Sequence, residues 1–183
     1  MGAQTVDRVP STMKAAAIDR FGPPSVLKLH ELPTPEPDAN QILIALHTAG
    51  VGSWDAEMRA GEWRPPGRVR FPRVLGLDGA GVVAAKGKNV RRFSVGDRVW
   101  AYDYDNAGFE AQYVAIDADS AGRVPRRLSL REAGTGAVTG LTALLGGAIA
   151  ASSHATKAGT RVAANASPEP FSNWFLSLAE DAF

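Results

Sequence analysis

The sequence contains no cysteine and only three histidines among its 183 residues. The absence of cysteine excludes disulfide bonds, a thiolate nucleophile and any zinc or iron–sulfur site held by thiolates. No stretch of the sequence approaches the roughly 18 consecutive apolar residues that span a bilayer. Positive and negative charges nearly balance, because the net charge is only +1. We therefore expect neither a membrane nor a nucleic acid as a partner.

We expect the first residues, 1–12, to be either a loose leader or a misplaced start, with Met13 as the alternative start, and they lack the apolar core that a secretory signal needs. We therefore expect a cytoplasmic protein. Apolar residues make up 45% of the sequence and charged residues 21%, which is typical of a globular protein. A chain of this length can form one domain and part of another.

Between Met13 and Val124, short apolar runs alternate with turns rich in glycine and proline. This pattern predicts many short strands, which we expect at Lys14–Asp19, Val26–Leu32, Gln41–Val51, Gly79–Ala85, Arg98–Tyr102 and Phe109–Ile116. One helix is expected at Ser53–Arg59, with Ser53 as its N-cap. Together these elements favour a mainly β fold, a partly open barrel with added helices.

The composition changes near Pro125, after which alanine and glycine become frequent. A helical tendency over Leu130–Ala151 is followed by a strand candidate at Arg161–Ala164 and a helix candidate at Asn173–Ala182. A strand followed by a helix is the opening of a βαβ unit. The sequence therefore predicts a barrel domain at 13–126 and an incomplete α/β fragment at 127–183.

A series of short segments follows one another along this chain: MKAAAIDRFGPPSVLKLHELPTPEP, QILIALHTAGVGSWD, LGLDGAGVV, VGDRVWAY, GFEAQYVAI and VTGLTALLG. Their order and spacing resemble the medium-chain dehydrogenase/reductase superfamily, in its zinc-independent, quinone oxidoreductase-like branch. The resemblance implies that 13–126 is a GroES-like catalytic domain and that 127–183 begins a nucleotide-binding Rossmann domain. It also implies an NADP(H)-dependent oxidoreductase whose substrate is a small-molecule quinone or enone.

The resemblance also implies that no zinc is bound. Zinc-dependent members place a cysteine and a histidine where this sequence has Gly52 and Leu77, and neither of these residues can donate a ligand. The histidines, His30, His47 and His154, show no ligand spacing. Without a Lewis acid, the implied chemistry is hydride delivery from a nicotinamide to a quinone or an activated alkene.

The resemblance places Val51, Gly52, Ser53, Trp54 and Asp55 at the border of a substrate cleft. Ser53 is a candidate catalytic residue because its hydroxyl would polarise a carbonyl oxygen, although an N-cap role explains it equally well. Asp55 is the second catalytic candidate, against the alternative of a structural partner for an arginine or a backbone amide.

Two aromatic residues, Trp63 and Tyr102, are candidate walls of the same cleft, with a place in the core as the alternative. For the cofactor, the resemblance places Thr139 near the nicotinamide, although a threonine at a helix start needs no ligand. Ser167 is the second cofactor-binding candidate, because it ends a segment that resembles the approach to the phosphate-binding turn.

The pattern breaks directly after Ser167, where the sequence reads Pro168-Glu169-Pro170 in place of glycines. Two prolines remove two amide donors, and Glu169 adds negative charge where phosphates would bind. We therefore expect weak binding of NADP(H) and no turnover by the isolated chain. Two functions stay open: an oxidoreductase by descent, and a non-catalytic GroES-like barrel that is an interaction module or an inert gene fragment. Neither function fixes an oligomeric state.

Overall fold

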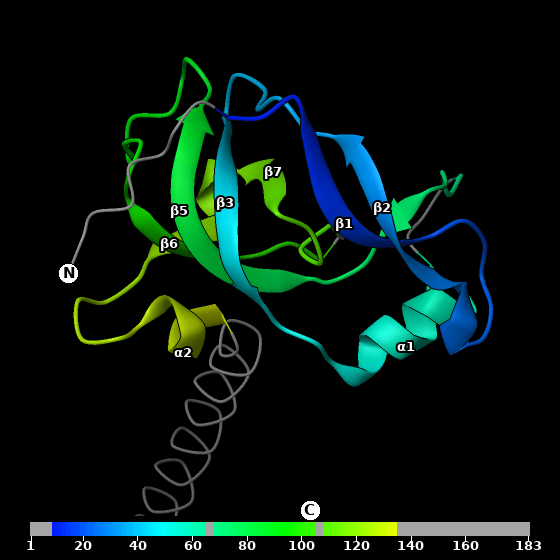
Figure 1. Cartoon of the computed structure of the whole chain (residues 1–183). Helices are drawn as coiled ribbons and strands as arrows, with labels where there is room; N and C mark the ends of the chain where they lie inside the picture. The colour runs from blue at the N-terminus through cyan, green and yellow to red at the C-terminus, as the bar shows by residue number, and fades with distance from the viewer. Residues whose placement is uncertain (1–8, 65–67, 105–107, 135–183) are drawn as a thin grey trace, which may run out of the picture. The chain divides into compact units, whose positions relative to one another are not determined.

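The structure is a computed structural model that describes residues 9–64, 68–104 and 108–134. These residues belong to one compact unit, Met1–Thr139, and the second unit, Gly140–Phe183, lies outside the described residues. The first half of the barrel contains β1 (Thr12–Ile18), the short 3-10 helix η1 (Pro24–Val26), β2 (Leu27–Pro33), β3 (Gln41–Ala49) and the helix α1 (Ser53–Ala60) (Figure 1). Four strands follow: β4 (Arg73–Val74), β5 (Asp78–Lys86), β6 (Arg98–Tyr102) and β7 (Tyr113–Asp117). The described elements end with the 3-10 helix η2 (Ala118–Ser120), β8 (Ala121–Arg123) and the helix α2 (Leu130–Gly134).

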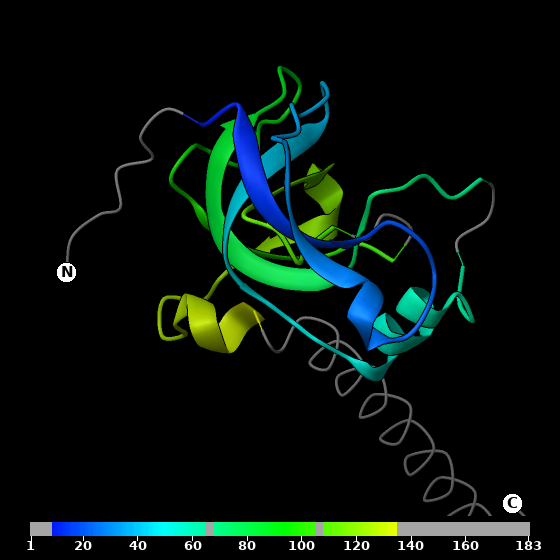
Figure 2. The same cartoon turned by 45° about the vertical axis from the view of Figure 1, so that its right-hand side comes forward.

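The strands form two sheets, one with the order β2-β1-β4 and one with the order β7-β3-β5-β6-β8. Every strand pair within the described residues is antiparallel. Residues 110–112 join the sheets, because the amide of Ala16 donates to the carbonyl of Glu110 (2.7 Å) and that of Leu46 to the carbonyl of Gln112 (2.8 Å). Figure 2 shows the strands curving around a shared interior. The expected partly open, GroES-like barrel is confirmed.

The interior is filled by apolar side chains. Buried residues alternate with less buried ones along β6 and β7, as the period of two in a strand predicts, whereas most residues of β5 are buried. Burying each large apolar side chain contributes about 1.5–3 kcal/mol to stability. The principal buried cluster contains Ile42, Ile44, Val83, Phe93, Val99, Phe109 and Ile116.

Two glycines allow β3 and β5 to approach closely. A Cβ atom on Gly81 would lie 2.1 Å from the carbonyl oxygen of Ala45, and one on Gly79 would lie 2.7 Å from that of Thr48. Any larger residue would push the strands apart at these points. Glycine at these two positions therefore allows a close approach of the two backbones.

The turn before β6 is built by Gly96 and Asp97. Gly96 has a φ of +92°, which favours glycine. The carboxylate of Asp97 accepts from the amide of Ser94 (2.8 Å) and pairs with Arg123 (2.8 Å). Burial opposes ionisation, but the Ser94 amide, Arg123 and Lys86 together hold the pKa of Asp97 below its usual range. The pair therefore forms a tight turn in which the carboxylate of Asp97 bonds a nearby backbone amide.

Three expectations about element ends are wrong. The N-cap of α1 is Gly52, and Ser53 is the first helical residue. The strand expected from Phe109 begins only at Tyr113, because residues 110–112 bond to both sheets instead of continuing one strand. That strand is also not the last, because β8 follows it.

The end of the chain is largely outside the described residues. Of the helix expected over Leu130–Ala151, the structure describes α2, which packs through Ala133 against Ala80 and Val124. The expected strand Arg161–Ala164, the expected helix Asn173–Ala182 and the predicted α/β fragment all lie outside. Within the described ranges, no helix is long and apolar enough to cross a membrane.

Candidate substrate-binding site

A pocket of about 310 Å³ lies where β3 leads into α1, and its walls are mostly aromatic. Six residues line it: Trp54, Glu57, Trp63, Leu77, Tyr102 and Tyr104. Trp54 and Glu57 are neighbours on one face of α1, because residues three apart meet on a helix surface. Leu77 directly precedes β5, Tyr102 ends β6, and Trp63 follows α1. The pocket therefore collects residues from four separate parts of the chain.

The aromatic rings contact one another in favourable geometries. The centroids of Trp63 and Tyr104 lie 4.8 Å apart with their planes tilted by 53°, and those of Tyr102 and Tyr104 lie 6.4 Å apart at 65°. Tilted and edge-on pairs of this kind add about 0.5–1.5 kcal/mol beyond the area they bury. Trp54, Trp63 and Tyr102 also pack on a buried cluster formed by Ile18, Val26, Met58, Leu75 and Leu77. Buried, packed apolar side chains therefore form the base of the pocket.

Helix α1 is fixed at both ends, which positions Trp54 and Glu57. Its last turn closes on Gly61, whose φ of +84° is the left-handed conformation common after helices. The guanidinium of Arg59 donates to the carbonyl of Gly22 (2.7 Å), and Met58 is buried. The helix is thus tied to the turn between β1 and β2.

Asp55 holds the start of α1. Its side chain is only 5% exposed, and it accepts hydrogen bonds from the amides of Gly52 (2.7 Å) and Gly76 (3.2 Å). Burial raises the pKa of Asp55, while the two amides act in the opposite direction. Both carboxylate oxygens are engaged by backbone amides, and Asp55 does not line the pocket. This geometry supports the structural alternative for Asp55.

Glu110 is a second, half-buried carboxyl group that lies close enough to Asp55 to be affected by its charge. Its backbone amide donates to the carbonyl of Leu75 (2.9 Å), and its side chain packs against Gly76, where a Cβ would lie 3.0 Å from the Glu110 Cγ. Burial, and then the nearby charge of Asp55, raise the pKa of Glu110 to about 7. No local sequence pattern links these two residues, so sequence reasoning did not identify Glu110.

The residues at the zinc positions of the resemblance do not fit a metal. Gly52 has no side chain, and a Cβ there would lie 2.2 Å from the indole of Trp54, which covers this position. Leu77 is 3% exposed and presents only carbon. In the part of the chain that the structure describes, no group of three or more histidine or acidic side chains is arranged to hold a metal ion. We therefore derive no chemistry through zinc.

The structure brings together three of the residues expected at the cleft: Trp54, Trp63 and Tyr102. Val51 is 81% exposed, Ser53 is exposed, and neither lines the pocket. The cofactor candidates Thr139 and Ser167 lie outside the described residues.

Sequence reasoning missed Glu57 and Tyr104, and it considered Leu77 only as a position without a metal ligand. Two signals point to the missed residues. Glu57 is three residues after Trp54 on the expected helix. Tyr104 is two residues after Tyr102, and this spacing returns a side chain to the same side of an extended strand.

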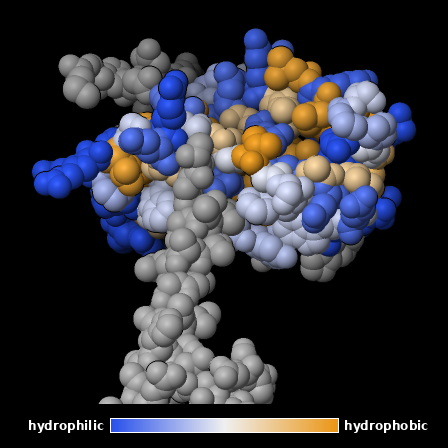
Figure 3. Space-filling view, turned by 90° about the horizontal axis from the view of Figure 1, so that it is seen from below, coloured by the Kyte–Doolittle hydropathy of each residue, from blue (hydrophilic) through white to orange (hydrophobic). Residues whose placement is uncertain are grey.

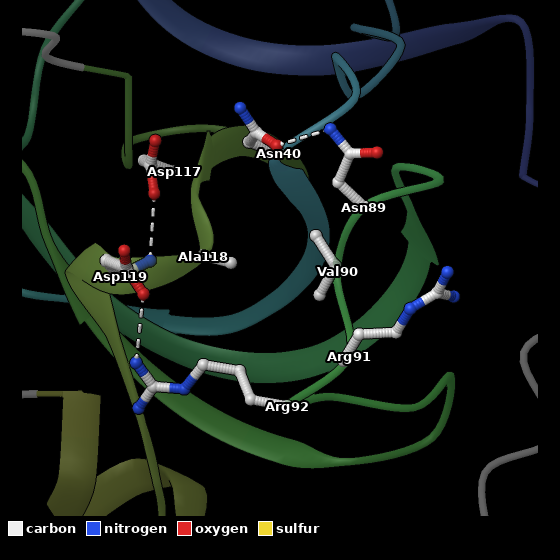
Figure 4. Close-up of a pocket in the computed structure, with 8 residues that line it drawn as sticks. All are labelled: Asn40, Asn89, Val90, Arg91, Arg92, Asp117, Ala118 and Asp119. Carbon is white, nitrogen blue, oxygen red and sulfur yellow. Dashed lines mark hydrogen bonds and ion pairs between the residues drawn. The ribbon is translucent and has the colours of Figure 1, made fainter.

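The surface of the barrel offers a second pocket of about 310 Å³, at the other end of β3. Its lining is polar, and Figure 4 shows its groups paired with one another: Asn89 with Asn40 (2.8 Å) and Arg92 with Asp119 (3.4 Å). Arg92 and Asp119 are also well exposed to water. The face at the α1 and α2 end carries hydrophobic residues in patches among hydrophilic ones (Figure 3). The aromatic pocket is therefore the better candidate for binding an organic substrate.

Comparison with known proteins agrees with this architecture. The family described as the alcohol dehydrogenase GroES-like domain matches residues 38–150. A second family, a domain of unknown function (DUF4126), matches residues 128–183, nearly all of which lie outside the described residues.

Several relatives of this chain are quinone oxidoreductases. The chain is 33% identical over 134 residues to a quinone oxidoreductase of Sus scrofa, covering 73% of this chain and 40% of that protein. The solved quinone oxidoreductase of Coxiella burnetii is 35% identical with a TM-score of 0.62, over 67% of this chain and 40% of that one. The Escherichia coli quinone oxidoreductase complexed with NADPH is 28% identical with a TM-score of 0.61. The match covers 66% of this chain and 36% of that one. Alcohol dehydrogenases also occur among the relatives.

The barrel and these matches identify the fold as the GroES-like domain that is found in this class of oxidoreductases. The chain belongs to the medium-chain dehydrogenase/reductase superfamily, among its quinone oxidoreductase-like members. It spans less than half the length of the relatives it matches.

Proposed function

We propose that the barrel is the substrate-binding half of a zinc-independent, NADP(H)-dependent reductase of small quinones or enones in the cytoplasm. One observation carries the proposal: the aromatic pocket lies beside Gly52 and Leu77, which offer no metal ligand. A substrate that reacts without a metal must already be electrophilic. Quinones and enones meet this condition, because conjugation with a carbonyl activates them toward hydride.

The pocket suits a flat, conjugated acceptor. Trp63, Tyr102 and Tyr104 offer ring faces and edges on which such a molecule stacks, and Leu77 closes the base. When bound, the nicotinamide supplies a hydride, and a proton from solvent completes the reduction of a quinone to a hydroquinone. The protein contributes orientation, which supplies a large share of the rate in such reactions.

The catalytic candidates take different roles in this proposal. Asp55 is a positioning residue, because it holds α1 and therefore Trp54 in place. Ser53 is exposed in the first turn of the same helix, so its hydroxyl is accessible to a substrate carbonyl. Val51 and Gly52 border the helix start and shape the approach to the pocket.

The cofactor side of the reaction depends on Thr139 and Ser167. Directly after Ser167, Pro168-Glu169-Pro170 is unfavourable for a pyrophosphate. This segment favours the second candidate function, a non-catalytic GroES-like barrel that is an interaction module or an inert gene fragment. The two candidates differ in the affinity for NADP(H) that they predict.

The pocket is tested by titrating a neutral planar quinone, such as 1,4-naphthoquinone, into the full chain by isothermal titration calorimetry. We expect Trp63→Ala to weaken binding about five- to tenfold, because it removes the stacking wall, and Trp63→Phe to keep most of the affinity. Equal affinity in Trp63→Ala and the unmodified chain would show that quinones bind elsewhere, and an absence of quinone binding would refute the proposed substrate class.

A further inference from the structure

The described lining of the aromatic pocket carries charge of one sign only, which is negative. Among the described residues that line it, Glu57 is the only charged one, and none is lysine, arginine or histidine. The nearby arginines on the same segment are engaged elsewhere. Arg59 donates to Gly22, while Arg64 lies over the ring of Phe21 (4.5 Å) and donates to the carbonyl of Gly61 (2.7 Å). The carboxylate of Glu57 therefore makes the potential at the pocket more negative, and the guanidinium groups of Arg59 and Arg64 are engaged with other partners.

The aromatic walls add to this potential. The faces of Trp and Tyr rings carry partial negative charge, so several rings around one space attract a cation. Four such residues line this pocket: Trp54, Trp63, Tyr102 and Tyr104. Aromatic walls with a single carboxylate at the side offer few hydrogen-bond partners, which suits a cation that needs none.

We propose that this pocket is an aromatic cage for a compact organic cation, and that a quaternary ammonium group is the class it fits best. The methyl groups of such a cation carry its positive charge to the ring faces, and Glu57 supplies the counter-charge. A neutral quinone uses the same walls without the help of Glu57. The inference rests on the pocket alone and holds whether or not the chain reduces any substrate.

The matched probes are choline and its neutral isostere, 3,3-dimethylbutan-1-ol, which has the same shape without the charge. Each is titrated into the full ¹⁵N-labelled chain, and binding is followed by the indole N–H signals in ¹H–¹⁵N spectra. We expect choline to bind about tenfold more tightly than the isostere, with shifts at the Trp54 and Trp63 indoles. Equal affinities for the two probes would overturn the proposal, and so would shifts that spare both indoles.

Variants separate the contribution of charge from that of shape. We expect Glu57→Gln to weaken choline binding about three- to fivefold and to leave the isostere unchanged. Glu62→Gln is the matched control, because Glu62 is exposed and does not line the pocket. Trp63→Ala should weaken both probes. Thermal unfolding of each variant confirms that it is folded, and an unchanged choline affinity in folded Glu57→Gln would refute the role of Glu57.

The quinone titration runs in parallel on the same samples. Choline binding without quinone binding supports the cage and refutes the proposed substrate class. Quinone binding without any preference for choline over its isostere supports the substrate class and refutes the cage.

Discussion

Two carboxyl groups lie close together behind the first turn of α1, away from the pocket. Asp55 is engaged by the amides of Gly52 and Gly76, and Glu110 packs against Gly76. Burial raises the pKa of both groups, and the charge of Asp55 raises that of Glu110 further, to about 7. At the residue scale, the folded state therefore disfavours the charged form of Glu110 at neutral pH.

This arrangement predicts a stability that depends on pH through Glu110. The folded state keeps the proton of Glu110 up to about pH 7, while the unfolded chain releases it near 4.5. Because the folded state binds more protons between these values, this group makes stability fall as pH rises from about 4.5 to 7. Glu110→Gln should remove that loss and stabilise the protein at pH 8 by on the order of 1–2 kcal/mol, after allowance for partial exposure.

The measurement is urea unfolding at pH 5 and pH 8. Glu36→Gln is the control, because Glu36 is exposed and should leave both values unchanged. If Glu110→Gln were destabilising at pH 8, the carboxylate would have a favourable partner, contrary to its raised pKa.

At the scale of elements, α1 is the part of the barrel that determines the pocket. It carries Trp54 and Glu57, and its position depends on Asp55 at one end and on Arg59 at the other. The helix is short, so its propensity alone would not keep it folded. Its contacts with the loop before β5 and with the turn after β1 therefore set the geometry of the site.

We predict that Asp55→Ala destabilises the protein by about 2 kcal/mol, because it leaves the buried amides of Gly52 and Gly76 without their acceptor. Quinone affinity should fall several-fold in the same variant, since Trp54 moves with the helix. Urea unfolding and calorimetric titration measure the two effects. Asp119→Ala, at a well-exposed carboxylate, should change neither. Loss of quinone affinity with unchanged stability would instead support a direct contact between Asp55 and the bound quinone.

The strands could be predicted from the sequence because they are short apolar runs that glycine and proline separate. The prediction erred at Phe109, because an apolar run does not reveal that residues 110–112 bond to two sheets. It erred at Ser53 because Asp55 caps the helix from within, so that Gly52 can take the N-cap position. In both cases tertiary contacts overrode the local preference.

The candidate site was predictable only in part. Trp54, Trp63 and Tyr102 follow from the resemblance, and the structure collects them in one pocket. The pairing of Asp55 with Glu110 depends on folding two distant segments together, and no local pattern contains it. Glu57 was overlooked because a single exposed acidic residue on a helix looks like ordinary surface.

At the scale of the whole molecule, the proposed function gives the substrate side of the reaction to the barrel and the cofactor side to Thr139 and the residues after it. We predict that the 183-residue chain binds NADPH with a dissociation constant in the millimolar range or weaker, a free energy of about −4 kcal/mol at best. Pro168 and Pro170 remove amide donors, and Glu169 repels phosphate. Equilibrium titration followed by nicotinamide fluorescence measures this affinity. Micromolar binding would show that the segment after Ser167 builds a phosphate site by another route.

The central claim is that the aromatic pocket beside α1 is the substrate site of this oxidoreductase domain. The most direct measurement is a ¹H–¹⁵N titration of the labelled chain with a soluble planar quinone. The account predicts that the indole signals of Trp54 and Trp63 shift together and saturate, while that of Trp100, which packs in a separate cluster under α2, does not move. Shifts confined to Trp100, or to the polar pocket around Asn89 and Asp119, would contradict it.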